Sequence, residues 1–288
     1  MLTTAPPAAA LTWAASVAGP RATITAVTEL GGGMHAATHL ITTENPWTET
    51  VLRRFEPGDD AAEREAHILS ALSILGGLDG FAPALLAADP GGELFGEPAV
   101  LISKLPGHGN ITPTDPLDWA TQLGRALARL HALPISAGFR DRITETKPPQ
   151  HPHVAESWDE MSSQPRVFSH VDYWSGNTVW TDQNLTGIVD WSAAGTAPRA
   201  YDLSWCRDDI MLIHDDETVA DAFLAAYESE SGTKIHDIFL WDLWTASRTL
   251  EHVHTWSKGY IDLGRPDMTG AFLTARKSAW LARLDARI

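Results

Sequence analysis

The chain has 288 residues, of which 44% are hydrophobic and 20% charged, a composition typical of globular proteins that excludes fibrous and intrinsically disordered classes. Its formal net charge of -16 argues against a DNA or RNA partner, because nucleic-acid binding depends on clustered lysine and arginine, and it leaves cationic small molecules open. Solubility alone also explains an acidic surface. The single cysteine, Cys206, cannot form an internal disulfide, so a cytoplasmic location is expected.

The N-terminal region contains an apolar stretch from Ala8 to Ala18. No lysine or arginine precedes it, and Pro6 and Pro7 stand at its start, so it is predicted to be an amphipathic helix rather than a targeting signal. Every later apolar run is interrupted by charges or prolines before it reaches the roughly 20 residues that span a bilayer. No membrane partner is therefore expected.

The first third of the chain is predicted to be rich in strands. Residues 22–30 and 37–42 alternate apolar and polar side chains on either side of a run of three glycines, which indicates two strands joined by a glycine turn. Further strands are predicted at 48–55 and 99–103, and one helix at 61–75, where apolar residues recur with a helical period.

The rest of the chain is predicted to be mainly helical, with one exception in its middle. Apolar residues three or four positions apart predict helices at 117–133, 217–227, 235–259 and 268–284. Short apolar strands separated by turn residues are predicted at 167–169, 178–180 and 185–189. A strand-rich part is thus followed by a helical part that contains a small hairpin.

The residues with the clearest chemical pattern lie in and around this hairpin. His170, Asp172 and Asn177 have the spacing His-x-Asp-x-x-x-x-Asn, which is that of a kinase catalytic loop, and Asp190 follows one strand-turn-strand later. Phosphoryl transfer needs a carboxylate to orient and deprotonate the attacking hydroxyl, and oxygen ligands for Mg2+. An Asp and an Asn at the two ends of one tight loop, with a second Asp beyond, can supply both.

The sequence resembles the aminoglycoside phosphotransferase and choline kinase-like family, relatives of the protein kinases, over nearly its whole length. The resemblance implies an α+β, two-lobed protein kinase-like fold, with a strand-rich nucleotide-binding lobe at 1–103 and a mainly helical lobe with the acceptor site at 104–288. It implies a phosphotransferase that uses ATP or GTP with Mg2+ and takes the hydroxyl of an antibiotic-like, sugar or amino-alcohol acceptor.

The catalytic positions of the family can be carried over to the hairpin. Asp172 resembles the catalytic base, and His170 the neighbour that shapes its loop. Asn177 and Asp190 resemble the Mg2+ ligands. Val171 stands where the family usually has glycine, which is tolerable if its backbone dihedral is ordinary.

Four of the implied nucleotide-binding positions lie in loops. Gly32 and Gly33 resemble the loop that covers the triphosphate, although a glycine turn needs no ligand. Ser103 and Leu105, in the linker between lobes, would offer backbone groups to the purine. Because backbone reads the purine there, ATP and GTP are not distinguished.

Two further nucleotide-side positions are charged. Arg53 stands in the place of the family's phosphate-binding lysine, and Glu65 resembles its helix partner, although a charge on a helix face is usually solvated. Arg53 and Arg54 are adjacent in a strand, so their side chains point to opposite faces. Alternation from Val51 favours Arg53 as the inward one and predicts that Arg54 is solvated.

Other residues have a structural interpretation beside a functional one. Asp202 resembles the Asp that buttresses the catalytic loop. The tryptophans of the late helices fit core packing better than stacking on an acceptor. Acidic residues after the hairpin could hold ammonium groups of a cationic acceptor, although a solvated surface is favoured; they are Asp208, Asp209, Asp215, Asp216 and Glu217.

Two rival functions remain beside the phosphotransferase. One is a pseudokinase that binds nucleotide or ligand without turnover, favoured only by Arg53 in place of lysine. The other is a hydrolase that uses Asp172 and Asp190 as a carboxylate pair, which leaves His170 and Asn177 unexplained. The sequence does not specify the acceptor or the oligomeric state.

Overall fold

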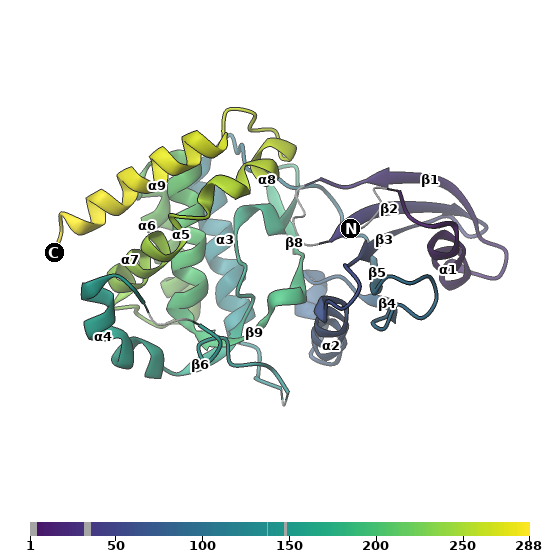
Figure 1. Ribbon diagram of the computed structural model, residues 1–288, viewed down its shortest axis with the longest axis horizontal. Coiled ribbons are helices and arrows are strands. Elements are labelled where there is room, and N and C mark those ends of the chain that lie inside the picture. The colour runs from purple at the N-terminus through teal and green to yellow at the C-terminus, as the bar shows by residue number, and fades with distance from the viewer. Residues whose placement is uncertain (1–4, 32–35, 137, 147–148) are drawn as a thin grey trace. The chain divides into compact units, whose positions relative to one another are not determined.

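The computed structural model describes residues 5–31, 36–136, 138–146 and 149–288. The chain forms two compact units (Figure 1). Unit 1 comprises Met1–Pro106 with Gly187–Ala193, and unit 2 comprises Gly107–Thr186 with Ala194–Ile288. Unit 1 therefore includes a seven-residue segment from late in the sequence. None of the helices in the described parts of the chain is long and apolar enough to span a bilayer.

Unit 1 is an antiparallel five-stranded sheet with two α-helices, as the α+β prediction requires. The strand order is β1-β2-β3-β5-β4. Its elements are α1 (Ala8–Ala18), β1 (Thr23–Glu29), β2 (Ala37–Glu44), β3 (Thr48–Arg54), α2 (Ala61–Ile74), β4 (Leu85–Asp89) and β5 (Ala99–Ser103). The helix predicted at 8–18 and the strands predicted at 22–30 and 37–42 are confirmed, whereas β4 was not predicted.

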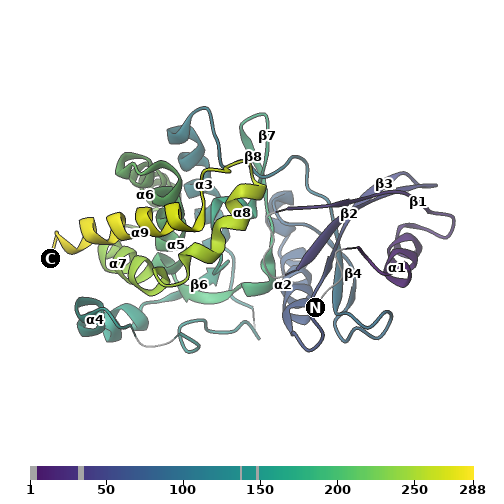
Figure 2. The same ribbon diagram turned by 45° about the horizontal axis from the view of Figure 1, so that its top comes forward.

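The two helices of unit 1 cover opposite faces of its sheet. The side chains of Leu52 and Leu101, paired across β3 and β5, form a core with Ala10 and Ala14 of α1. Side chains alternate along a strand, so Arg53 points to the other face, where it reaches α2. β3 is consequently buried on both sides, as in Figure 2, where α1 and α2 flank the sheet.

Unit 2 is mainly helical, with two small two-stranded sheets that pair β6 with β9 and β7 with β8. Its elements are α3 (Pro116–His131), α4 (Pro152–Ser163), β6 (Arg166–Ser169), β7 (Thr178–Thr181), β8 (Asn184–Ile188), β9 (Gly195–Pro198), α5 (Arg199–His214), α6 (Glu217–Ser231), α7 (Ile238–Thr249), α8 (Ser257–Asp262) and α9 (Gly270–Asp285). The end of β8 belongs to unit 1.

The core of unit 2 is built around α5, which packs against α6, α7 and α9. α3 and α6 pack closely along their length, because Gly124 of α3 has no side chain. A Cβ atom at Gly124 would lie 2.2 Å from the carbonyl oxygen of Phe223. Trp241 and Trp244 of α7 are buried, as predicted, whereas Trp256 is only half-buried.

Several elements of unit 2 differ from the prediction. The single helix expected at 235–259 is wrong: α7 ends at Thr249, a 3-10 turn spans Val253–Trp256, and α8 follows. α4, β9 and α5 were not predicted. α5 is buried on almost every side and carries charged residues in its interior-facing positions, so it lacks the apolar stripe by which surface helices are recognised.

Candidate active site

The loop predicted to be catalytic lies in unit 2 and begins where β6 ends at Ser169. Its first two backbone N–H groups donate to Asp202 of α5, from His170 to Oδ2 at 2.8 Å and from Val171 to Oδ1 at 2.7 Å. Val171 has φ of 73°, so the condition under which it was called tolerable, an ordinary dihedral, is not met. A β-branched residue in this conformation is costly, and the two bonds to a buried carboxylate help to hold it there.

Two more residues of α5 hold the rest of the loop. Asp209 accepts the Ser175 N–H at 3.0 Å, and the Trp205 indole Nε1 donates to Asp172 Oδ1 at 3.0 Å. Asp202, Trp205 and Asp209 are three and four positions apart, which places them on one helix face. α5 thus fixes the loop at its start, at Asp172 and near its end.

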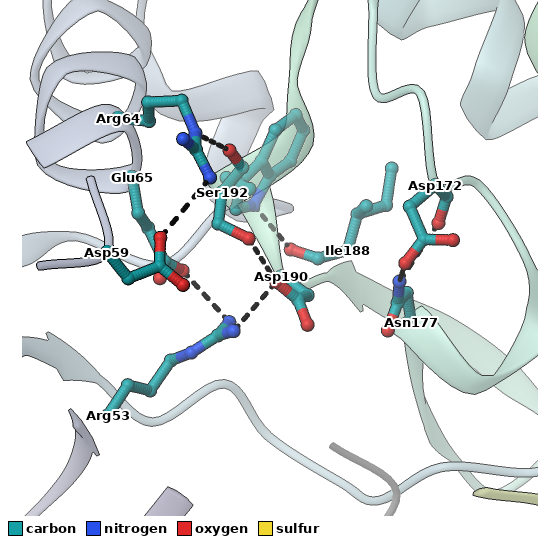
Figure 3. A network of polar contacts seen from close by, with 10 residues as sticks. Arg53, Asp59, Arg64, Glu65, Asp172, Asn177, Ile188, Asp190 and Ser192 are labelled. Carbon is teal, nitrogen blue, oxygen red and sulfur yellow. Dashed lines mark hydrogen bonds and ion pairs between the residues drawn. The ribbon is translucent and has the colours of Figure 1, made fainter. Parts of the chain in front are cut away.

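Asp172 is oriented by two side-chain donors, Trp205 and Asn177, of which Figure 3 draws Asn177. Besides the Trp205 bond, the Asn177 Nδ2 donates to Asp172 Oδ2 and to the Asp172 carbonyl oxygen, both at 2.9 Å. Each carboxylate oxygen has two lone pairs, so it can accept a further proton donor. The amide nitrogen of Asn177 is committed to Asp172, and the oxygen is its remaining polar atom. Amide oxygens are ligands that suit Mg2+.

His170 has a different position. Its side chain is fully buried, and its ring lies edge-on to Tyr173 at 6.1 Å between centroids. Tyr173 is buried as well and donates to the Leu123 carbonyl oxygen at 2.9 Å. His170 is therefore part of the packing beneath the loop.

A second group of predicted residues lies in unit 1 (Figure 3). Arg53 bridges two carboxylates, with its NH1 2.9 Å from Glu65 Oε1 and its NH2 2.7 Å from Asp190 Oδ1. Arg53 and Glu65 are buried, so Glu65 is not a solvated charge. The guanidinium contacts each carboxylate through a different nitrogen, whereas a lysine side chain has only one nitrogen with which to contact both.

The segment that carries Asp190 is held against α2. Arg64 Nε donates to the Ser192 carbonyl oxygen at 2.9 Å, and the Ser192 hydroxyl donates to Asp190 Oδ1 at 3.0 Å. The Trp191 indole donates to the Ile188 carbonyl oxygen at 3.0 Å. Asp190 itself has φ of 64°, a left-handed conformation that this set of bonds stabilises.

Arg54 is the clearest correction to the prediction for this sheet. It is fully buried rather than solvated, and its NH1 lies 2.6 Å from Glu97 Oε2. The alternation of side chains along a strand correctly predicts that Arg53 and Arg54 point to opposite faces of the sheet. The error lay in assuming that one face meets solvent, because helices cover both.

Burial changes the acidity of carboxyl groups in both units. It raises the pKa of Glu65 from 4.5 to about 7, although the neighbouring Arg53 opposes the rise. It also raises the pKa of Asp209 to about 6, against the opposing hydrogen bonds from Ser175 and Tyr260. Both carboxyl groups are therefore near a protonation change around neutral pH.

The remaining predicted nucleotide positions are in loops. Gly32 and Gly33 lie outside the described residues. The Ser103 N–H donates to the Ala84 carbonyl oxygen at 2.9 Å, so strand pairing uses the backbone donor of Ser103. The Leu105 carbonyl oxygen accepts from the Lys104 ammonium at 3.2 Å.

The acidic residues after the hairpin are not a uniform solvated surface. Asp208 and Asp209 are buried, and Asp208 forms an ion pair with buried Lys277. Trp205 and Asp209 were not predicted to hold the loop. They could have been predicted from their spacing, because Trp205 and Asp209 follow Asp202 by three and seven positions and so lie on the same face of a helix.

Comparison with known proteins gives one consistent result. The Phosphotransferase enzyme family matches residues 26–242. Homoserine kinase from Polaromonas naphthalenivorans is 30% identical over 165 residues, covering 48% of this chain and 52% of that protein. Homoserine kinase from a Janthinobacterium strain is 26% identical over 235 residues, covering 70% of each. The chain spans about half the length of the first of these relatives.

Solved structures show the same fold at low sequence identity. A macrolide 2'-phosphotransferase from Brachybacterium faecium has a TM-score of 0.59 and 18% identity, covering 95% of this chain and 96% of that one. A choline kinase from Streptococcus pneumoniae has a TM-score of 0.61 and 16% identity, covering 90% and 94%. The fold is thus protein kinase-like, and the chain belongs to the Phosphotransferase enzyme family.

Proposed function

We propose that this chain transfers the γ-phosphoryl group of ATP or GTP to a hydroxyl of a small molecule, with Mg2+ as cofactor. The observation that carries the proposal is the fixed carboxylate of Asp172. Trp205 and Asn177 each donate to one of its oxygens at 3.0 and 2.9 Å, and the loop around it is braced by α5. A rigid carboxylate suits a group that must orient an attacking hydroxyl.

In this mechanism Asp172 accepts the hydrogen bond of the acceptor hydroxyl and takes its proton as the phosphoryl group is transferred. Asn177 and Trp205 keep the carboxylate from rotating away. His170 and Asp202 act beneath the loop, as positioning residues. Contacts within unit 2 support each of these proposed functions.

The nucleotide side uses the charges of unit 1. Arg53 would hold the phosphates, and Glu65 would hold Arg53 in place. Asn177, just before β7 in the sequence, and Asp190, just after β8, have the oxygen donors that suit Mg2+. The cation would supply neutralisation of charge on the phosphates. Gly32, Gly33, Ser103 and Leu105 remain proposed nucleotide contacts.

The acceptor classes of the relatives set the range to be tested. Proteins similar to this chain are named for homoserine, for macrolides and for choline. All of these acceptors carry an alcohol, which is the group that Asp172 would orient. An alcohol acceptor is therefore the common proposal.

A second candidate function is a nucleotide-binding protein without turnover. The ion pair between Arg53 and Asp190 favours it, because the proposed Mg2+ ligand is already bound to a cation of the chain. The phosphotransferase reading requires this pair to loosen when nucleotide binds. The pseudokinase reading does not.

An isosteric substitution separates the two. ADP formation is measured with ATP and with GTP, Mg2+ and a panel of alcohols, for wild type and Asp172→Asn. We expect Asp172→Asn to lower kcat by about 100-fold or more, the range for loss of a general base, with little change in nucleotide KM. Asp182→Asn, which removes the same charge from the exposed β7–β8 turn, is the matched control. Equal turnover in all three proteins would refute the proposed role of Asp172.

A further inference from the structure

Beside Asp172, the described residues include an aromatic cluster of which the mechanism above uses only Trp205. Trp205, whose indole donates to Asp172, packs against Trp256 with 5.5 Å between ring centroids. Trp244 and Tyr201 lie beside each other at 5.1 Å, in an edge-to-face arrangement. These rings come from α5, α7 and the turn before α8, and all belong to unit 2.

Arg248, in the last turn of α7, lies over three of these rings. Its guanidinium carbon is 4.0 Å from the Trp244 ring centroid, 4.9 Å from that of Trp205 and 5.6 Å from that of Tyr201. Stacking on aromatic rings restricts a guanidinium while leaving its N–H groups in the plane able to donate. Arg248 is exposed, so a ligand can reach these donors.

Arg248 differs from the other cation of the cluster in its partners. Lys277 is fully buried, and its ammonium is paired with Asp208 and bonded to Thr249 Oγ1 at 2.9 Å. For Arg248, no carboxylate among the residues that the structure describes lies within 4.0 Å of its nitrogens. Its charge and its donors are therefore available to a ligand.

We propose that Arg248 binds the carboxylate of the acceptor, and that the acceptor is a short hydroxy acid, such as an amino acid with a side-chain alcohol. This inference rests on the proposed function, in which Asp172 orients the hydroxyl. The Trp205 ring contacts both groups, with its centroid 4.9 Å from the Arg248 guanidinium carbon and its Nε1 3.0 Å from Asp172 Oδ1. A small molecule with a hydroxyl at one end and a carboxylate at the other can therefore bind both groups.

Electrostatics favours such an acceptor over a cationic one. A carboxylate brought close to Asp172 is repelled by it, and Arg248 supplies the opposing charge. A quaternary ammonium acceptor would need aromatic faces, but Arg248 covers one face each of Trp205 and Trp244, while Lys277 lies 5.0 Å from the Trp256 centroid. A second cation there would meet like charge. The acidic Asp208, considered above for ammonium groups, is already paired with Lys277.

The test compares two acceptors that differ by one group. L-homoserine and 3-amino-1-propanol share an alcohol and an amine, and only the first has a carboxylate. We expect wild type to prefer L-homoserine, and Arg248→Met to lower kcat/KM for L-homoserine by about 10- to 100-fold, as for loss of a charged hydrogen bond. For 3-amino-1-propanol the variant should equal wild type. Arg248→Lys, which keeps the charge, should recover part of the loss.

Arg287→Met is the matched control, because Arg287 also stacks on an aromatic ring, that of Phe239 at 4.9 Å, on another part of unit 2. It should leave both acceptors unchanged. If Arg248→Met lowers kcat/KM equally for both acceptors, Arg248 acts by supporting Trp205, and the inference is overturned. An unchanged value for L-homoserine overturns it as well.

Calorimetric binding keeps this inference separate from the proposed function. Wild type should bind L-homoserine more tightly than 3-amino-1-propanol, and Arg248→Met should remove that difference, whether or not either compound is phosphorylated. Equal binding of the two compounds by wild type counts against the carboxylate site. Absence of Asp172-dependent turnover with every alcohol counts against the phosphotransferase alone.

Discussion

Replacing Glu65 by glutamine should make the protein more stable, by an amount that grows with pH. Burial raises the pKa of Glu65 from 4.5 to about 7, so the fold favours its protonated form. Below pH 4.5 Glu65 is protonated in both the folded and the unfolded state, so its raised pKa does not change the free energy of unfolding. As the pH rises, Glu65 ionises more readily in the unfolded state, and the resulting loss of unfolding free energy is complete above pH 7. At about 1.4 kcal/mol per pKa unit, the charged carboxylate destabilises the fold by about 3 kcal/mol at high pH.

Glutamine keeps the shape of the side chain and can accept the Arg53 hydrogen bond, but it never ionises. Any change in unfolding free energy that Glu65→Gln causes independently of pH cancels when the difference between variant and wild type is compared at two pH values. The gain in unfolding free energy of Glu65→Gln over wild type should therefore increase by about 2 kcal/mol between pH 5.5 and 8.5. Urea unfolding followed by tryptophan fluorescence measures it. Glu63→Gln, exposed on the same helix, is the control and should show no such trend.

A difference between Glu65→Gln and wild type that stays constant from pH 5.5 to 8.5 would refute this reasoning. It would mean that Arg53 holds Glu65 ionised throughout the range, and that Coulombic attraction outweighs burial at this site.

Two further substitutions test the supports of the loop proposed to be catalytic and of the helical core. Asp202→Ala leaves the buried N–H groups of His170 and Val171 without their acceptor, and should lower the unfolding free energy by about 3 kcal/mol or more; a urea midpoint equal to that of wild type would count against it. Lys277→Met leaves Asp208 as an uncompensated buried charge and should cost about 3–5 kcal/mol, whereas Lys277→Met combined with Asp208→Leu should regain most of that stability. If the double variant is no more stable than the single one, the ion pair is not the reason for the loss.

The parts of this molecule that could be predicted are those set by local sequence. The spacing of His170, Asp172 and Asn177 predicts a kinase-type loop, and alternation in the first strands predicts the sheet. These patterns depend on few residues that are close in sequence. The structure keeps them in the predicted elements.

What the sequence did not reveal depends on what packs against each element. Arg54 is buried because a helix covers a face of the sheet that alternation alone cannot show to be covered. Val171 has a positive φ, and the bond from its N–H to Asp202, on an unpredicted helix, helps to hold it there. The contacts of Trp205 and Asp209 with the loop were not predicted for the same reason, because both residues lie on α5 and α5 itself was not predicted.

The late segment Gly187–Ala193 has a consequence for how the chain is made. Unit 1 needs it, because Asp190 is a partner of Arg53 and the Ile188 N–H donates to the Phe81 carbonyl oxygen at 2.7 Å. Chains are synthesised from the N-terminus at about 5–20 residues per second, and domains generally fold as units during synthesis. The first 106 residues therefore leave the ribosome well before the segment that completes their sheet and helix. Unit 1 should reach its final stability only after the ribosome has passed Ala193, so its folding has to wait for the synthesis of Gly107–Thr186, the first part of unit 2.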